Sequence, residues 1–297
     1  MKPLLIIMKR NIKLFFKDKG MLITSLITPL ILLVLYATFL AQVYKDSFLS
    51  VMPAGVNLAE SLIDGCVGGQ LCSSLLAVCC ITVAFCANML MVQDKVTGAR
   101  RDLTVSPVEP SKLALGYYLS TAIVTLIICL VATGACFLYM GKVGWYLSAA
   151  DVLYLLLDVF LLVMLGTALS SVIGFFLSTQ GQISAVGTVV SAGYGFICGA
   201  YMPISQFGEG LQKVLSFLPG TYGTALLRNH AMQGVFAEME AQNIPAEAVD
   251  ALRAAVDCEI RFFDQTVSLS AMYLILAGSV LALIIGYVLM NVLAKNK

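Results

Sequence analysis

The segment QDKVTGARRDLTVSPVEPSK, residues 93–112, lies between two long apolar stretches and decides how the chain is arranged. It carries four basic and three acidic residues, whereas each flanking stretch is long enough to cross a bilayer. Pro107 and Pro110 follow its charged part, and proline lacks an amide donor and restricts the residue before it. We therefore expect a short charged helix over 93–103 and then a stiff turn. Such a helix suits docking into a groove of a partner protein, and an ordinary charged loop is the alternative.

The composition places the chain in the membrane class. It has 297 residues, of which 60% are hydrophobic and 12% charged. The formal net charge of +1 gives no indication of nucleic-acid binding. Most of the nine cysteines fall within apolar stretches and none forms a CxxC pair, so we interpret them as small buried hydrophobic residues.

Six apolar stretches are long enough to span a membrane, since a helix needs about 20 apolar residues to cross the hydrocarbon core. They predict an all-α membrane protein with six transmembrane helices, at residues 21–43, 68–92, 113–140, 152–178, 183–202 and 268–294. We accordingly divide the chain into an interfacial helix over 1–20 and a transmembrane domain over 21–297.

The distribution of lysine and arginine predicts the orientation of these spans. Segments 1–20, 93–112 and 295–297 would share one side of the membrane, and together they hold twelve basic residues. The opposite loops hold six over a much greater length. Because cytoplasmic loops carry an excess of Lys and Arg, we expect a multi-pass plasma-membrane protein with both termini in the cytoplasm.

Residues 2–17 show an amphipathic pattern outside the spans. On a helix, the apolar side chains avoid an arc of about 100° that holds the basic ones. The residues within that arc are Lys2, Lys9, Arg10, Lys13 and Lys17. We expect this helix to lie in the cytoplasmic interface with its basic face towards anionic lipid headgroups. A simple extension of the first span is the alternative.

The longest segment outside the spans is 203–267. Its first part is too apolar for a free loop and too broken by glycine and proline for a span, which predicts short re-entrant helices in the outer leaflet. Residues 245–261 then predict an external amphipathic helix that Pro245 can start. The apolar residues on one of its faces are Val249, Leu252, Val256 and Ile260.

Few polar side chains suggest chemistry. Asp158 is a candidate intramembrane acid, either hydrogen bonded to a neighbouring helix or in contact with substrate. His230 is the single histidine, and we expect it to be exposed on the external side. Cys66 and Cys258 would face the oxidising side, where they either form a disulfide or stay free thiols. The pattern predicts no catalytic residue and no metal site.

Two ordered motifs narrow the function. The charged segment combines acidic, basic, glycine, leucine and Ser-Pro positions, at Asp94, Lys95, Gly98, Arg100, Arg101, Leu103, Ser106 and Pro107. The second motif comprises GAYMPI at 199–204, LPGTY at 218–222, and Arg228. In their order and spacing, these motifs resemble the membrane subunits of ATP-binding cassette (ABC) transporters of the type-2 exporter class. Ala99 stands where that class usually has threonine.

The resemblance implies that the chain is a permease and that the eight residues of the first motif form a coupling segment. The implied partners are two ABC ATPase subunits, a second permease copy or homologue, and membrane lipids. ATP and Mg²⁺ would bind the ATPase subunits, because this sequence has no GxxxxGK[ST] phosphate loop. We therefore expect neither a cofactor nor an enzymatic activity in this chain. A membrane enzyme and a channel or secondary carrier are the alternatives of other classes.

A substrate path is expected along the second and fifth spans. Its candidate residues are Phe85, Asn88, Met89, Tyr194 and Phe196. This apolar and aromatic lining favours outward movement of an amphipathic small molecule, drug or lipid. A lipid-linked polysaccharide is the alternative substrate, since permeases for such molecules share the fold.

Overall fold

The computed structural model describes residues 2–52, 58–105, 108–263 and 265–295, and most of them are helical. The α-helices are α1 (Lys2–Lys17), α2 (Lys19–Leu35), α3 (Ala41–Val51), α4 (Glu60–Val96), α5 (Ala99–Val105), α6 (Pro110–Val143), α7 (Ala149–Phe176), α8 (Gln180–Ile197), α9 (Glu209–Leu215), α10 (Pro219–Ala241), α11 (Ala246–Ala255) and α12 (Leu269–Lys295). The shorter elements are the π-helical turn η1 (Tyr36–Leu40), the 3-10 turn η2 (Ile204–Gln206), and the antiparallel strands β1 (Arg261–Phe262) and β2 (Gln265–Thr266). The prediction of an all-α membrane protein is confirmed.

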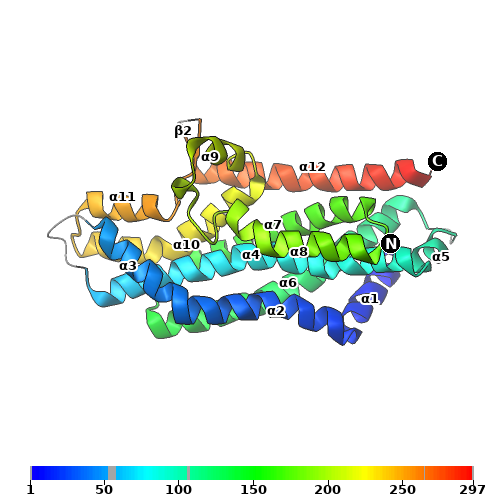
Figure 1. Cartoon of the computed structure of the whole chain (residues 1–297), viewed down its shortest axis with the longest axis horizontal. Helices are drawn as coiled ribbons and strands as arrows, with labels where there is room; N and C mark the ends of the chain where they lie inside the picture. Colours follow the sequence, from blue (N-terminus) through cyan, green and yellow to red (C-terminus); the bar gives the residue numbers. More distant parts are fainter. Residues whose placement is uncertain (1, 53–57, 106–107, 264, 296–297) are drawn as a thin grey trace.

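The long helices run side by side along one axis (Figure 1). Both chain ends and α5 lie at one end of this bundle, which we call the terminal end. Helices α3 and α11 lie at the opposite end, which we call the far end. Helix α4 packs against α6, α7, α8 and α10, and is therefore the central helix of the bundle.

Helix α4 is central because it is apolar around its whole circumference, as helices buried in the middle of a protein are. Glycines let two neighbours approach its backbone closely. A Cβ atom at Gly69 would lie 2.9 Å from the backbone oxygen of Ala231 in α10. One at Gly166 in α7 would lie 2.7 Å from that of Cys80. Larger side chains at either glycine would push the neighbouring helix away.

Within the described residues, five helical segments are long and apolar enough to cross a membrane. They are Lys19–Val51, Glu60–Val96, Pro110–Val143, Ala149–Phe176 and Leu269–Ala294. These segments correspond to five of the six predicted spans. The remaining prediction, 183–202, falls on α8, which has 18 residues and ends at Ile197, just before Gly199 with φ of +75°. The count of six spans stays a prediction.

The charged segment is divided between two helices, so the prediction of one helix over 93–103 is wrong. Helix α4 continues to Val96, and α5 begins at Ala99. Gly98 lies between them with φ of +83°, in the left-handed region that glycine adopts without steric cost. The charged segment therefore turns sharply at the terminal end.

The predicted amphipathic helix 245–261 extends too far. Val249 and Leu252 are buried on α11 as the pattern predicts, but this helix ends at Ala255. Asp257 then has φ of +52°, and its carboxylate accepts hydrogen bonds from backbone amides elsewhere in the chain. A long-range contact therefore ends the helix, which helical periodicity cannot reveal. The preceding α10, with 23 residues, is longer than the short helices expected there.

Candidate functional site

Asp94, in the last turn of α4, ties the charged segment to two other helices. Its carboxylate accepts two hydrogen bonds from the Arg10 guanidinium of α1, at 2.6 and 3.0 Å, and one from the Tyr117 hydroxyl of α6, at 2.6 Å. Hydrogen bonding to Asp94 raises the pKa of Arg10 above its ordinary value. Arg10 therefore links α1 to α4, rather than joining the headgroup-facing set that the helical pattern predicted.

Lys95 and Arg100 also make contacts within the chain. The Lys95 ammonium donates hydrogen bonds to the backbone oxygens of Gly174, Phe175 and Leu177, at 2.8, 2.7 and 2.9 Å. It thereby caps the C-terminal end of α7, where a positive charge is favourable. Arg100 donates a hydrogen bond of 2.7 Å to the Asn291 side-chain oxygen, which connects α5 to α12.

The outer face of α5 is formed by other residues. Arg101, Asp102 and Thr104 are exposed, and Val105 is 81% exposed, whereas Leu103 is half-buried. Of the predicted coupling residues, Ser106 and Pro107 lie outside the described residues. A partner approaching α5 would therefore meet Arg101 and Val105. Arg100 instead holds α5 to α12, and Asp94 and Lys95 hold the end of α4 to its neighbours. Val105 was missed because the resemblance drew attention to charged, glycine and proline positions.

A cavity of about 550 Å³, which we call the groove, lies between α4, α7 and α8, and Thr24 of α2 also lines it. Phe85, Asn88 and Met89 of the predicted path line it. The other lining residues are Cys86, Val92, Ser170, Ile173, Gly174, Leu177, Ile183, Ser184, Val186, Gly187, Thr188, Ser191 and Ala192. Its described lining includes no charged side chain.

Two residues of the predicted path do not line the groove. Tyr194 lies close to α10, where its hydroxyl oxygen would clash with a Cβ atom at Gly220. Phe196 packs edge-on against Tyr201, with 5.1 Å between the ring centroids. The structure thus brings together the three α4 residues of the predicted path and separates them from the two α8 residues.

Asn88 provides a polar feature within the groove wall. Its amide nitrogen donates a hydrogen bond of 2.6 Å to the backbone oxygen of Ser170 in α7. Its side-chain oxygen is buried and, among the described residues, accepts no hydrogen bond. A buried acceptor without a donor is costly, so a rotation that turned this oxygen towards a donor group in the groove would be favourable.

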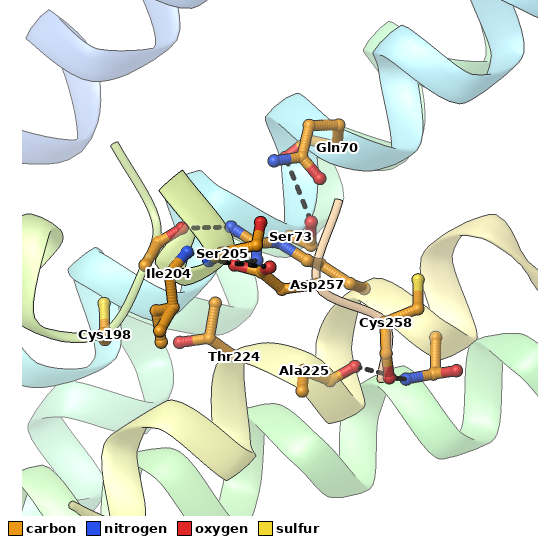
Figure 2. Close-up of polar contacts among 12 residues, drawn as sticks. Gln70, Ser73, Cys198, Ile204, Ser205, Thr224, Ala225, Asp257 and Cys258 are labelled. Atoms are coloured by element: carbon orange, nitrogen blue, oxygen red, sulfur yellow. Dashed lines mark hydrogen bonds and ion pairs between the residues drawn. The ribbon is translucent and has the colours of Figure 1, made fainter. Parts of the chain in front are cut away.

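At the far end, Arg228 and Asp257 connect the second motif to the segment after α11. The guanidinium donates a hydrogen bond to the Gly199 backbone oxygen and lies 3.6 Å from the Asp257 carboxylate. Figure 2 shows Asp257 beside Ile204 and Ser205, whose backbone amides donate hydrogen bonds to its carboxylate. Arg228 is 1% exposed and Asp257 4%. The turn after α8 is thus held to α10 by a desolvated ion pair.

His230 is not exposed, which contradicts the prediction for this residue. It is 8% exposed, and its ring nitrogen Nδ1 is hydrogen bonded to the carboxylate of Asp158, a buried residue 72 positions away in the sequence. Of the two alternatives for Asp158, the structure shows the hydrogen bond to a neighbouring helix. Sequence spacing could not reveal this pair, because α7 and α10 are brought together only by the fold.

Cys66 and Cys258 are both free thiols, and both are buried. Burial raises the pKa of Cys258 to about 12, which disfavours its reactive thiolate form. The structure therefore shows the free-thiol alternative. In the parts of the chain that the structure describes, no three His, Cys, Asp or Glu side chains gather into a metal site.

Comparison with known proteins identifies one family. Residues 3–231, well over half of the chain, match the family model described as ABC-2 type transporter. The match includes α5, the groove and Arg228. No curated protein matches the sequence significantly.

Proposed function

Since the chain belongs to the ABC-2 type transporter family, we propose that it is the permease of an ATP-driven exporter that moves an amphipathic small molecule, drug or lipid outwards. Two separate ATPase subunits would supply the energy, and a second copy of this chain or a homologue would complete the membrane part. ATP and Mg²⁺ would bind those ATPase subunits.

The groove is the observation that favours an amphipathic substrate. Its lining is mostly apolar, and hydroxyl-bearing residues and Asn88 interrupt it. A rotation of the Asn88 side chain would let a hydroxyl or ammonium group donate to its oxygen while the rest of the molecule contacts apolar side chains. A lipid-linked polysaccharide joined through phosphate would need cationic partners, which the described lining does not supply.

The positive-inside pattern supports placing the terminal end in the cytoplasm. In that orientation, the exposed face of α5 would contact an ATPase subunit. Lys95 and Arg100 would transmit its movement to α7 and α12, because their hydrogen bonds connect the turn and α5 to those helices.

Substrate efflux from proteoliposomes tests the proposal. The full chain is reconstituted with its ATPase, and ATP-dependent export of uncharged and cationic amphipathic dyes is compared with that of a lipid-linked anionic glycan. We expect dye export, and Asn88→Leu should lower export of a donor-bearing dye about threefold to tenfold, the contribution of one net hydrogen bond.

Thr82→Val is the matched control, because Thr82 is buried on the same helix but does not line the groove. It should leave the export ratio of donor-bearing to donor-lacking dyes unchanged. Export of the glycan without export of any dye would replace this proposal by the polysaccharide alternative. Substrate movement that continues without ATP would instead indicate a channel or secondary carrier.

A further inference from the structure

Three side chains from three helices meet towards the far end of the bundle. The His230 ring nitrogen Nδ1 lies 2.6 Å from one Asp158 carboxylate oxygen. The Tyr273 hydroxyl of α12 donates a hydrogen bond of 2.6 Å to the other oxygen. The Tyr154 ring stacks on the imidazole, with 4.9 Å between centroids. This cluster joins α10 to both α7 and α12.

The imidazole is the member of the cluster that can exchange a proton with water most readily. Asp158 is completely buried, whereas His230 retains 8% exposure and Tyr154, which covers its ring, is 49% exposed. Histidine is also the side chain whose charge ordinarily changes between about pH 5 and 8. A proton can therefore reach Asp158 through the histidine.

Helices α4, α7, α11 and α12 pack against α10. Towards the imidazole, α7 contributes Asp158 and Tyr154, and α12 contributes Tyr273. Arg253 of α11 meets α10 at Phe236 and Glu240 instead. At its close approach to α10, α4 places Gly69 against Ala231 and Met232.

After α11, the chain presents Asp257 to Arg228 instead of to the imidazole. Arg228 and His230 are two positions apart and thus point to different sides of α10. Arginine keeps its charge at all physiological pH values. Of these two attachments of α10, the one at His230 contains the side-chain type whose charge ordinarily changes in this range.

We propose that Asp158, His230 and Tyr273 form a proton-binding site that fastens α10 to α7 and α12. A protonated imidazole pairs with the buried carboxylate and compensates its charge. When the proton leaves, the carboxylate loses its counter-charge in a desolvated place, which is unfavourable. The attachment of α10 is therefore strongest at low pH and weakens as the pH rises through the imidazole transition. In the orientation proposed above, the proton would come from outside the cell.

The test uses the full chain in lipid nanodiscs and does not depend on knowing the substrate. Hydrogen exchange of residues 219–241 is measured between pH 5 and 8.5, with correction for intrinsic exchange. Because the chain has one histidine, its imidazole gives one NMR signal that can be titrated alongside. We expect protection of α10 to fall about tenfold over the pH range in which that signal titrates, because loss of the proton leaves the buried carboxylate without its counter-charge.

Variants separate this site from a general effect of pH. His230→Gln should remove the pH-dependent step, and Tyr273→Phe, which keeps the ring, should retain it at lower overall protection. Ala237→His in the His230→Gln background is the control, because Ala237 is exposed on the same helix. Its imidazole should titrate without changing the protection of α10.

Two outcomes would overturn the proposal. In the first, the wild-type imidazole titrates while α10 protection stays constant. In the second, His230→Gln shows the same pH-dependent step as the wild type. The wild-type measurement alone decides the first outcome, so the test survives a variant that does not fold.

Discussion

The two ends of the bundle use ion pairs of different kinds. At the terminal end, the Arg10 side chain remains 31% exposed while it bonds Asp94. At the far end, the Arg228 and Asp257 side chains are 1% and 5% exposed. A partly hydrated pair can adjust to movement at modest cost, whereas a desolvated pair must keep its partners. The far end is therefore expected to be rigid at Arg228, and the terminal end more adaptable around α5.

The largest effect is expected from Asp257→Ala at the far end. The change leaves the Arg228 guanidinium buried without its counter-charge and frees the amides of Ile204 and Ser205. Loss of one partner from a buried pair costs about 3–5 kcal/mol. Thermal unfolding of the detergent-solubilised chain should show a correspondingly large decrease in Tm.

Glu240→Ala is the matched control for Asp257→Ala. Glu240 pairs with Arg253 at 3.6 Å, but its side chain is 63% exposed, so the loss should stay below about 1 kcal/mol. Equal decreases in Tm for the two variants would contradict the distinction between the far-end pair and a surface pair.

A smaller loss is expected from Asp94→Asn at the terminal end. The amide keeps the shape of the carboxylate but loses its charge-assisted hydrogen bonds to Arg10. Hydrogen bonds to charged groups contribute about 1.5–3 kcal/mol. We expect a decrease at the lower end of that range, because Arg10 can rehydrate. Asp102→Asn, on the exposed face of α5, serves as the control and should leave Tm unchanged. A loss as large as that of Asp257→Ala would show that both ends are equally desolvated.

Much of this fold could be predicted because membrane spans are local features of the sequence. Length and hydropathy located the helices, and the charged, proline-containing segment marked the turn between α4 and α6. Helix α8 was harder to classify, because glycine and polar residues shorten its apolar part. The predicted end of the external helix at residue 261 was wrong for another reason. The helix ends at Ala255, because the Asp257 carboxylate accepts a hydrogen bond from the distant turn at Ile204.

The polar contacts could not be predicted, because each joins residues that are far apart in the sequence. Asp94 was interpreted as part of a docking surface, yet its guanidinium partner lies 84 positions earlier. His230 was expected on the surface for lack of a visible partner. A charged residue at the end of a span has two uses, anchoring and docking, and sequence pattern alone does not distinguish them.

The smallest effect on stability is expected at Arg101, and a comparison with the adjacent Arg100 separates anchoring from docking most clearly. Arg101 is exposed on α5, so Arg101→Glu should change the unfolding free energy by less than about 0.5 kcal/mol. If α5 docks on an ATPase subunit, the reversed charge should nevertheless strongly reduce the permease-dependent stimulation of that subunit's ATP hydrolysis, because charge complementarity sets such contacts.

Arg100→Glu places the same charge beside the Asn291 oxygen, which then loses its hydrogen-bond donor, so this variant should lower Tm as well. The two variants are compared by thermal unfolding and by ATPase activity in nanodiscs. Normal stimulation with Arg101→Glu would remove this arginine from the proposed docking surface, and an unchanged Tm with Arg100→Glu would contradict the anchoring of α5 to α12.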